Sequence, residues 1–394
     1  MRDNVAVITG LGVISAAGTG LAANLASLKA GLRNAGPTSL FETSLRNPVF
    51  EVKGMPAGSY PDGQRTLHLA RMAVSEALDD AWLKDSLHRF RVGVCLGTTV
   101  ASQLNDLDFY SAYRSTGSAR MEPVERYLKG NLAEAVSRIF NASGPALTVV
   151  NACSSGADAI GVALSFLRND LCDIAVAGGA DELSRIPLCG FASLGIASGR
   201  LCAPFDKDRS GLNLGEGAGV IILEKRQTAA DRGMMAGVFL AGYGAEADAY
   251  HLTAPHPEGR GLRSAINAAL EAAGVEPRQI DFVNAHGTGT RDNDLVEGKV
   301  ISDIFGAGIK MLSTKGFTGH TLGAAGGIEA VFTAAALREQ WIPASIGFIN
   351  RDDAIPVTPV MEPARINSRY AISTSLAFGG NNAALVFGRM EQTA

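Results

Sequence analysis

The stretch Val149-Val-Asn-Ala-Cys-Ser-Ser-Gly156 decides the fold, because an apolar strand runs here into a turn of small residues and then into a helix. We predict the strand over Ala146–Val150 and the helix, rich in Ala and Gly, over Ser155–Leu167. Cys153 falls at or near the first turn of this helix. The context is similar to a nucleophile elbow, in which a reactive side chain is exposed at a sharp turn.

Two interpretations of Cys153 compete. A helix N-terminus carries partial positive charge, which predicts a stabilised thiolate and a lowered pKa for the thiol. Ser154, Ser155 and Gly156 leave room for a substrate, and the backbone N–H of Cys153 is placed to help form an oxyanion hole. The other interpretation is a buried packing cysteine, since free cysteine packs as a small apolar residue. The local context leaves both open.

Strands and helices alternate on both sides of this stretch. We predict strands over Val5–Thr9, Val92–Leu96, Ile174–Ala177, Gly219–Glu224, Val238–Ala241 and Ile280–Ala285. Apolar spacing predicts helices over Leu67–Leu83, Leu262–Ala273 and Gly326–Arg338. Gly10 and Gly12 are predicted to form a turn, and Tyr370–Thr374 and Ala383–Phe387 a hairpin through Gly379-Gly380. The alternation is typical of a layered α/β architecture.

The second half of the chain repeats the plan of the first. The strand Ile280–Ala285 runs into Gly287-Thr288, as Val92–Leu96 runs into Gly97-Thr98. We interpret this as an internal duplication with its seam at Arg226–Met235, which predicts halves at 1–232 and 233–394. The alternative is that any α/β protein looks self-similar at this level.

Composition excludes several classes of protein. Apolar residues make up 46% of the 394 residues and charged residues 19%, which indicates a compact globular enzyme. The net charge of −4 argues against nucleic acid binding. We find no apolar stretch of membrane-spanning length and no signal peptide, so we expect a cytoplasmic protein. The five cysteines are Cys95, Cys153, Cys172, Cys189 and Cys202. None of them forms a CxxC pair and no histidine cluster has zinc spacing, so no metal site is predicted.

Two of the six histidines stand in glycine-rich loops. His286 ends a predicted strand and opens Gly287-Thr-Gly-Thr290, at the kind of strand end where α/β proteins place ligand loops. His320 lies in Ser313-Thr-Lys-Gly-Phe-Thr-Gly-His-Thr-Leu-Gly-Ala-Ala-Gly-Gly327, another small-residue loop before a helix. Either histidine alone is more often structural, but two such loops and the Cys153 turn together favour a catalytic site.

Lys315 and Glu329 frame the His320 loop. Such residues usually form a solvated surface pair, but their small and apolar neighbours favour a buried pair that orients the loop. The glycine-rich loops lack nucleotide-binding spacing, and we predict no nucleotide cofactor.

Five motifs together resemble the elongating β-ketoacyl-acyl carrier protein synthases of the thiolase superfamily. The motifs are Ala152-Cys-Ser-Ser-Gly156; Pro204-Phe-Asp-Lys-Asp-Arg209 with Leu214-Gly-Glu-Gly-Ala218; Asn284-Ala-His-Gly-Thr-Gly-Thr290; Ser313-Thr-Lys315 with Thr318-Gly-His320; and Phe378-Gly-Gly380. They occur in the family's order and cover nearly the whole chain. The resemblance implies a thiolase-like five-layered αβαβα fold made of two duplicated halves, and a homodimer or a heterodimer with a related ketosynthase-like subunit.

The resemblance also implies roles for single residues. Cys153 would accept the acyl chain, and His286 and His320 would assist decarboxylation of malonyl-acyl carrier protein and stabilise the enolate. Lys315 and Glu329 match the family's supporting pair. The remaining matches concern the substrate: Thr288 and Thr290 would hold the phosphopantetheine arm, and Phe378 would act as gate and complete the oxyanion hole with Cys153. The substrates would arrive on the phosphopantetheine of acyl carrier protein, with no separate cofactor.

Some segments depart from the family pattern. Leu376 and Ala377 stand where Phe and Gly are common, Asn381-Asn382 where Thr-Asn is usual, and Asp106–Leu132 is atypical. Chain length and pathway, whether fatty acid, polyketide or polyene, therefore stay open. The main alternative function is a non-catalytic chain-length-factor-type partner, which would lack the nucleophile. A thiolase would need a second cysteine late in the chain, and a chalcone-synthase-like enzyme an asparagine in place of the second histidine.

An acidic carrier protein needs a basic surface. We predict that surface from scattered cationic residues of the chain: Arg65, Arg126, Lys129, Lys207 and Arg209.

Overall fold

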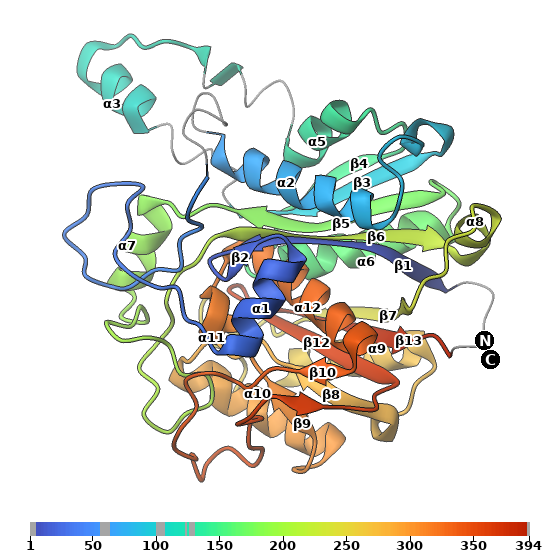
Figure 1. The fold of residues 1–394 in the computed structure, drawn as a ribbon. Coiled ribbons are helices and arrows are strands. Elements are labelled where there is room, and N and C mark those ends of the chain that lie inside the picture. The colour runs from blue at the N-terminus through green and yellow to red at the C-terminus, as the bar shows by residue number, and fades with distance from the viewer. Residues whose placement is uncertain (1–4, 56–63, 100–106, 123, 126–130, 392–394) are drawn as a thin grey trace.

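The computed structural model describes residues 5–55, 64–99, 107–122, 124–125 and 131–391 (Figure 1). The first half builds five strands in the order β4-β3-β5-β6-β1. Their bounds are Ala6–Ser15 (β1), Val92–Gly97 (β3), Ala146–Val149 (β4), Ile174–Asp181 (β5) and Gly217–Lys225 (β6). β3 pairs parallel with β4 and β5, and β6 pairs antiparallel with β5 and β1.

The second half has the same strand plan. Its strands are Val238–Ala247 (β7), Ile280–Asn284 (β8), Lys310–Leu312 (β9), Tyr370–Ala377 (β12) and Asn381–Arg389 (β13). Their order, read from the far edge, is β9-β8-β12-β13-β7, with parallel pairs around β8 and antiparallel pairs around β13. β1 and β7 pair antiparallel and join the two halves into one sheet. The division of the chain at residue 232 stays a prediction.

Helices form three layers around these strands (Figure 1). α2 (Arg65–Asp80) and α5 (Leu132–Phe140) cover the outer face of the first half, and α9 (Arg260–Ala273) and α10 (Arg291–Phe305) that of the second. α6 (Ser155–Arg168) and α12 (Ala325–Glu339) lie between the two halves and contact strands of both. The predicted five-layered αβαβα fold class is therefore confirmed.

Short elements connect these layers. They are β2 (Gly18–Thr19), α1 (Leu21–Ala30), η2 (Leu87–Arg89), α3 (Leu107–Thr116), α7 (Arg185–Ser193), α8 (Arg226–Asp231), η4 (Pro277–Gln279), α11 (Lys315–Thr318), η5 (Leu322–Ala324), β10 (Trp341–Ile342) and β11 (Ala364–Arg365). No helix in the described ranges is both long and apolar enough to cross a membrane.

The predicted turn at Gly10 and Gly12 is wrong, because both glycines lie inside β1. Both positions require glycine because α2 lies directly on the strand. A Cβ added at Gly10 would stand 2.0 Å from the backbone oxygen of Ala77, and one added at Gly12 would stand 1.9 Å from that of Ala73. These glycines therefore mark a close approach between helix and sheet, for which a glycine is needed as much as for a turn.

Candidate active site

Cys153 lies in the turn between β4 and α6, just before Ser154, the residue that precedes the helix. The turn is strained, because Ala152 has a φ of 48°, in the left-handed region that residues with a side chain rarely adopt. The Ser155 hydroxyl holds it from inside: it accepts from the Asn151 N–H at 2.8 Å and donates to the Ala152 oxygen at 2.6 Å. The predicted strand–turn–helix context of Cys153 is thus confirmed.

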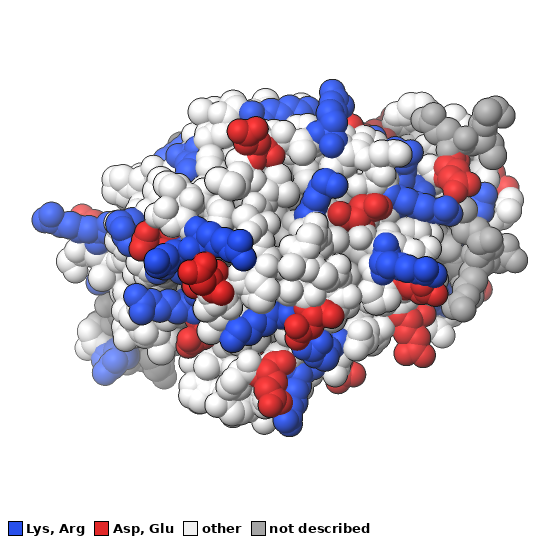
Figure 2. Space-filling view, turned by 90° about the horizontal axis from the view of Figure 1, so that it is seen from below, with Lys and Arg blue, Asp and Glu red and all other residues white. Residues whose placement is uncertain are grey.

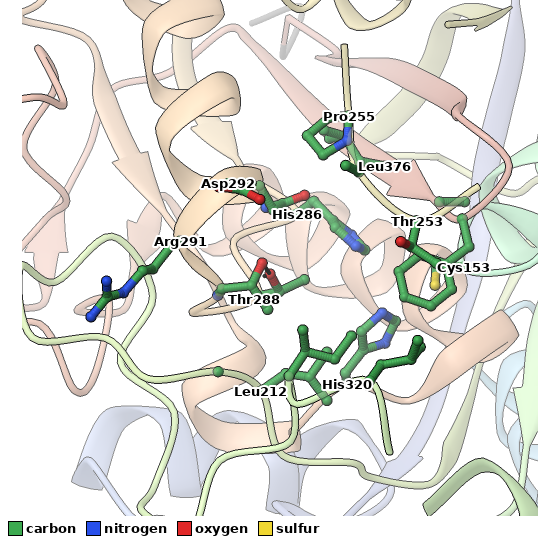
Figure 3. A pocket seen from close by; sticks show the side chains of 18 of the residues that line it. Cys153, Leu212, Thr253, Pro255, His286, Thr288, Arg291, Asp292, His320 and Leu376 are labelled. Atoms are coloured by element: carbon green, nitrogen blue, oxygen red, sulfur yellow. Dashed lines mark hydrogen bonds between the residues drawn. The ribbon is translucent and has the colours of Figure 1, made fainter. Parts of the chain in front are cut away.

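Three of the predicted site residues meet at one point (Figure 3). The Cys153 Sγ and one ring nitrogen each of His286 and His320 lie within 4.8 Å of one another, and all three side chains are buried. The two imidazole rings stand edge to face, with centroids 5.2 Å apart. His286 follows β8, and His320 lies between α11 and η5.

Hydrogen bonds fix the tautomer of each histidine. The Leu322 N–H donates to His320 Nδ1 at 3.1 Å, and the Lys315 ammonium donates to His286 Nδ1 at 3.0 Å. An Nδ1 that accepts a hydrogen bond leaves the proton of a neutral imidazole on Nε2. Burial and the nearby Lys315 charge lower the pKa of both histidines well below the usual value, so both rings are neutral. The cluster therefore offers two N–H donors, whereas a metal ion would need free nitrogen lone pairs.

The predicted lowering of the Cys153 pKa is wrong. Burial raises the pKa of this thiol to about 11, although the Lys315 charge and a hydrogen bond from the Phe378 N–H act in the opposite direction. Desolvation outweighs the helix N-terminus because the sulfur lies inside the protein. The resting cysteine is therefore a neutral thiol with a backbone donor already directed at it.

Lys315 and Glu329 form the expected buried ion pair. The Lys315 ammonium also donates to the His286 carbonyl oxygen at 2.6 Å, so one cation contacts the backbone, the ring and the carboxylate. Burial raises the pKa of Glu329 to about 7, partly offset by Lys315. A second buried carboxylate, Glu297, accepts from the N–H groups of His286 and Gly287 at 2.8 Å each. Sequence reasoning missed Glu297, which belongs to no glycine-rich loop.

A pocket of about 430 Å³ leads to the cluster. Thr288, Thr290 and Phe378 line it as predicted, and the two threonine hydroxyls are 2.9 Å apart. Phe191 also lines it and was not predicted. Its ring stacks on that of Phe378 with centroids 5.4 Å apart, so two aromatic rings border the cysteine. Arg291, at the start of α10, is a further pocket residue outside the predicted set.

Two of the five residues predicted to form a basic surface, Arg65 and Arg209, are not on the surface. Arg65 is buried and pairs with Glu216 at 2.6 Å, and Arg209 is buried and pairs with Asp352 at 2.6 Å. Lys207 is exposed, whereas Arg126 and Lys129 lie outside the described residues. On the face shown in Figure 2, Lys and Arg side chains are interspersed with Asp and Glu.

Comparison with known proteins identifies the family. The model "Beta-ketoacyl synthase, N-terminal domain" matches residues 54–229, and "Beta-ketoacyl synthase, C-terminal domain" matches 238–349. The 3-oxoacyl-[acyl-carrier-protein] synthase 2 of Synechocystis sp. is 34% identical and aligns over 98% of both chains. The chain belongs to the β-ketoacyl synthase family. The predictions of family and enzyme class, an acyltransferase of the 3-oxoacyl-acyl carrier protein synthase type, are thereby confirmed.

Two solved structures are also similar to this chain over nearly its whole length. The ishigamide ketosynthase/chain length factor is 33% identical with a TM-score of 0.93, and the match covers 98% of this chain and 99% of that one. A type II polyketide synthase ketosynthase in complex with its acyl carrier protein is 25% identical with a TM-score of 0.90, again covering 98% and 99%. Both polyketide-type and fatty-acid-type synthases are therefore similar to this chain.

Proposed function

We propose that this chain joins an acyl group to malonyl-acyl carrier protein by decarboxylative condensation, with Cys153 as nucleophile and His286 and His320 as the enolate-stabilising pair. The product is 3-oxoacyl-acyl carrier protein. The observation that carries the proposal is the meeting of one thiol and two neutral, Nε2-protonated imidazoles at the end of a single pocket.

In the first half-reaction, Cys153 attacks the carbonyl carbon of the incoming acyl thioester. The Phe378 N–H already points at the sulfur and stabilises the negative charge that develops on the carbonyl oxygen. The carrier's sulfur leaves and takes up the proton that the Cys153 thiol gives away. Since burial raises the pKa of the thiol to about 11, Cys153 rests as a thiol at pH 7 and has to give up this proton for its sulfur to attack.

In the second half-reaction, malonyl-acyl carrier protein loses carbon dioxide. The electron pair of the broken carbon–carbon bond enters an enolate, whose oxygen accepts hydrogen bonds from His286 Nε2–H and His320 Nε2–H. The enolate carbon then attacks the acyl carbon on Cys153, a carbon–carbon bond forms, and the cysteine sulfur leaves as a thiolate. This thiolate takes up one proton from the solvent, which restores the resting thiol. Neither step needs a separate cofactor, because the substrates are delivered on phosphopantetheine.

Thr288 and Thr290 support the assignment of the pantetheine channel. Thr288 lies at the pocket wall between Arg291 and the two histidines (Figure 3). Thr290 lines the same pocket with its hydroxyl 2.9 Å from that of Thr288, and a long polar arm has to pass here. We propose acyl carrier protein as the partner that presents this arm. The similar type II polyketide ketosynthase is itself in complex with an acyl carrier protein, which supports this choice of partner.

A non-catalytic chain-length-factor role is the second candidate, which similarity to the ishigamide ketosynthase/chain length factor favours. The complete Cys153, His286 and His320 set argues for the catalytic role. The partner subunit is proposed to bind along β4, an edge strand whose Leu147 is 42% exposed and whose following Val150 is 67% exposed. We also propose the division into halves at residue 232, which falls between α8 and β7, and a cytoplasmic location.

Half-reactions measured separately test the proposal. Cys153→Ala should abolish acyl-enzyme formation and condensation, as detected by intact-protein mass and product analysis with malonyl-carrier protein and acyl primers of graded length. Retained condensation by Cys153→Ala refutes it. His320→Ala should slow release of carbon dioxide more than acyl transfer, and an equal loss in both would contradict its role. The same product analysis determines chain length.

A further inference from the structure

Asp158 is a buried carboxylate that takes no part in the proposed chemistry and contacts residues on both sides of Cys153. Asp158 is in the first turn of α6 and is 5% exposed. Its oxygens accept three hydrogen bonds: from Asn151 Nδ2 at 2.6 Å, from the Ser154 hydroxyl at 2.7 Å and from the Tyr243 hydroxyl at 2.8 Å. Hydrogen bonds to a charged acceptor are the stronger ones, so these three form a firm connection.

The three donors come from different parts of the molecule. Asn151 and Ser154 flank the strained turn that carries Cys153, one before it and one after it. Tyr243 belongs to β7, a strand of the second half. Asp158 therefore ties both ends of the nucleophile turn to the half of the protein that supplies His286 and His320.

The turn needs such a connection because its backbone is strained. Ala152 keeps its left-handed φ of 48° only if the surroundings enforce it. The Ser155 hydroxyl bonds are local to the turn and fix its shape but not its place. The Asp158 contact to Tyr243 reaches across to the second half and thus fixes where the turn stands relative to the histidines.

We propose that Asp158 and Tyr243 form a positioning pair that holds the nucleophile turn and thereby sets the rate of acyl transfer to Cys153. The pair acts through the turn and does not touch the reacting atoms. This inference rests on the proposed nucleophilic role of Cys153. Decarboxylation depends on the two imidazoles, which Lys315 and the Leu322 N–H hold independently, so it should be little affected by the pair.

Tyr243→Phe is the decisive variant. The Tyr243 ring lies against Gly161, where an added Cβ would stand 2.4 Å from the ring, so phenylalanine keeps the packing and removes only the hydroxyl. Tyr370→Phe is the matched control. Tyr370 starts β12, at the opposite end of that strand from the pocket-lining Leu376 and Ala377.

The experiment measures acyl-enzyme formation on Cys153 and carbon dioxide release from malonyl-carrier protein at 25 °C, with thermal unfolding in parallel. In Tyr243→Phe we expect acylation to slow about tenfold, the effect of losing one hydrogen bond to a charged group, and decarboxylation to stay within about twofold. Tyr370→Phe should change neither rate. Asp158→Asn should reproduce the pattern, and if it fails to fold, Tyr243→Phe decides alone.

The outcomes separate a positioning role from a structural one. A decrease in acylation at least threefold larger than that in decarboxylation supports the pair; any smaller difference, including a lowered melting temperature with unchanged rates, overturns it. Cys153→Ala is assayed in the same series. If that variant still condenses, the proposed function is wrong, whereas normal acylation by Tyr243→Phe overturns only the positioning pair.

Discussion

Lys315→Met removes the cation that contacts His286 and Glu329 and keeps a side chain of similar length. Two effects should follow. The Glu329 carboxylate loses its buried partner, which is strongly unfavourable in a dry environment. The His286 Nδ1 loses the donor at 3.0 Å that fixes its tautomer, so the Nε2–H directed at the enolate is no longer enforced.

The cost in stability follows from the pKa of Glu329. Burial raises that pKa from 4.5 to about 7 even with Lys315 present, so without the lysine the carboxyl is neutral in the folded protein at pH 7. The unfolded chain ionises it above pH 4.5. The Glu329 contribution to stability is therefore complete below pH 4.5 and is lost as pH rises toward 7, by about 3 kcal/mol at about 1.4 kcal/mol per pH unit.

The double variant Lys315→Met/Glu329→Gln is the matched control, since glutamine has the same shape and does not ionise. In urea unfolding at pH 7, the double variant should be about 3 kcal/mol more stable than the single one, and at pH 4.5 the two should agree. Both variants should release carbon dioxide about 100-fold more slowly than the wild type, the usual effect of losing one oriented donor. A gap in stability that is equal at the two pH values, or a double variant with restored decarboxylation, would refute this reasoning.

The raised pKa of Cys153 predicts that its alkylation by iodoacetamide, followed by mass spectrometry of its peptide, accelerates about tenfold per pH unit from pH 7 to 9; a plateau below pH 8 would contradict it. Burial also raises the pKa of Glu297 to about 7, so Glu297→Gln should lessen the loss of stability between pH 4.5 and 7 by about 3 kcal/mol in unfolding curves, and an unchanged slope would count against this assignment. Gly326→Ala should lower the free energy of unfolding by about 1–3 kcal/mol and slow acylation, because the new Cβ would stand 2.6 Å from the Ala157 nitrogen and overpack the contact between α12 and α6. A variant with wild-type stability and acylation rate would show that these two helices can separate freely.

Most strands that end in turns of small residues were predictable, whereas the same signal at Gly10 and Gly12 was wrong because these glycines lie inside β1. The hairpin of β12 and β13 and the positions of Cys153, His286 and His320 follow from local patterns in the chain. Contacts between distant segments were not predictable. Arg65 looks like a surface cation until Glu216, 151 residues later, is seen beside it. Burial of the Cys153 sulfur likewise depends on the second half of the fold, and a helix N-terminus alone therefore gave the wrong direction for its pKa.

The repeated strand plan explains why the site straddles both halves. Cys153 lies between β4 and α6, and His320 lies between β9 and α12, which are the corresponding places in the two strand orders. α6 and α12 pack together in the central layer through glycines: an added Cβ on Gly156 would stand 2.7 Å from the Gly327 nitrogen. Two equivalent turns are thereby brought to one pocket, one carrying a thiol and the other an imidazole. In the proposed reaction the nucleophile comes from one half and both N–H donors come from the other, so this reaction requires the contact between the two helices.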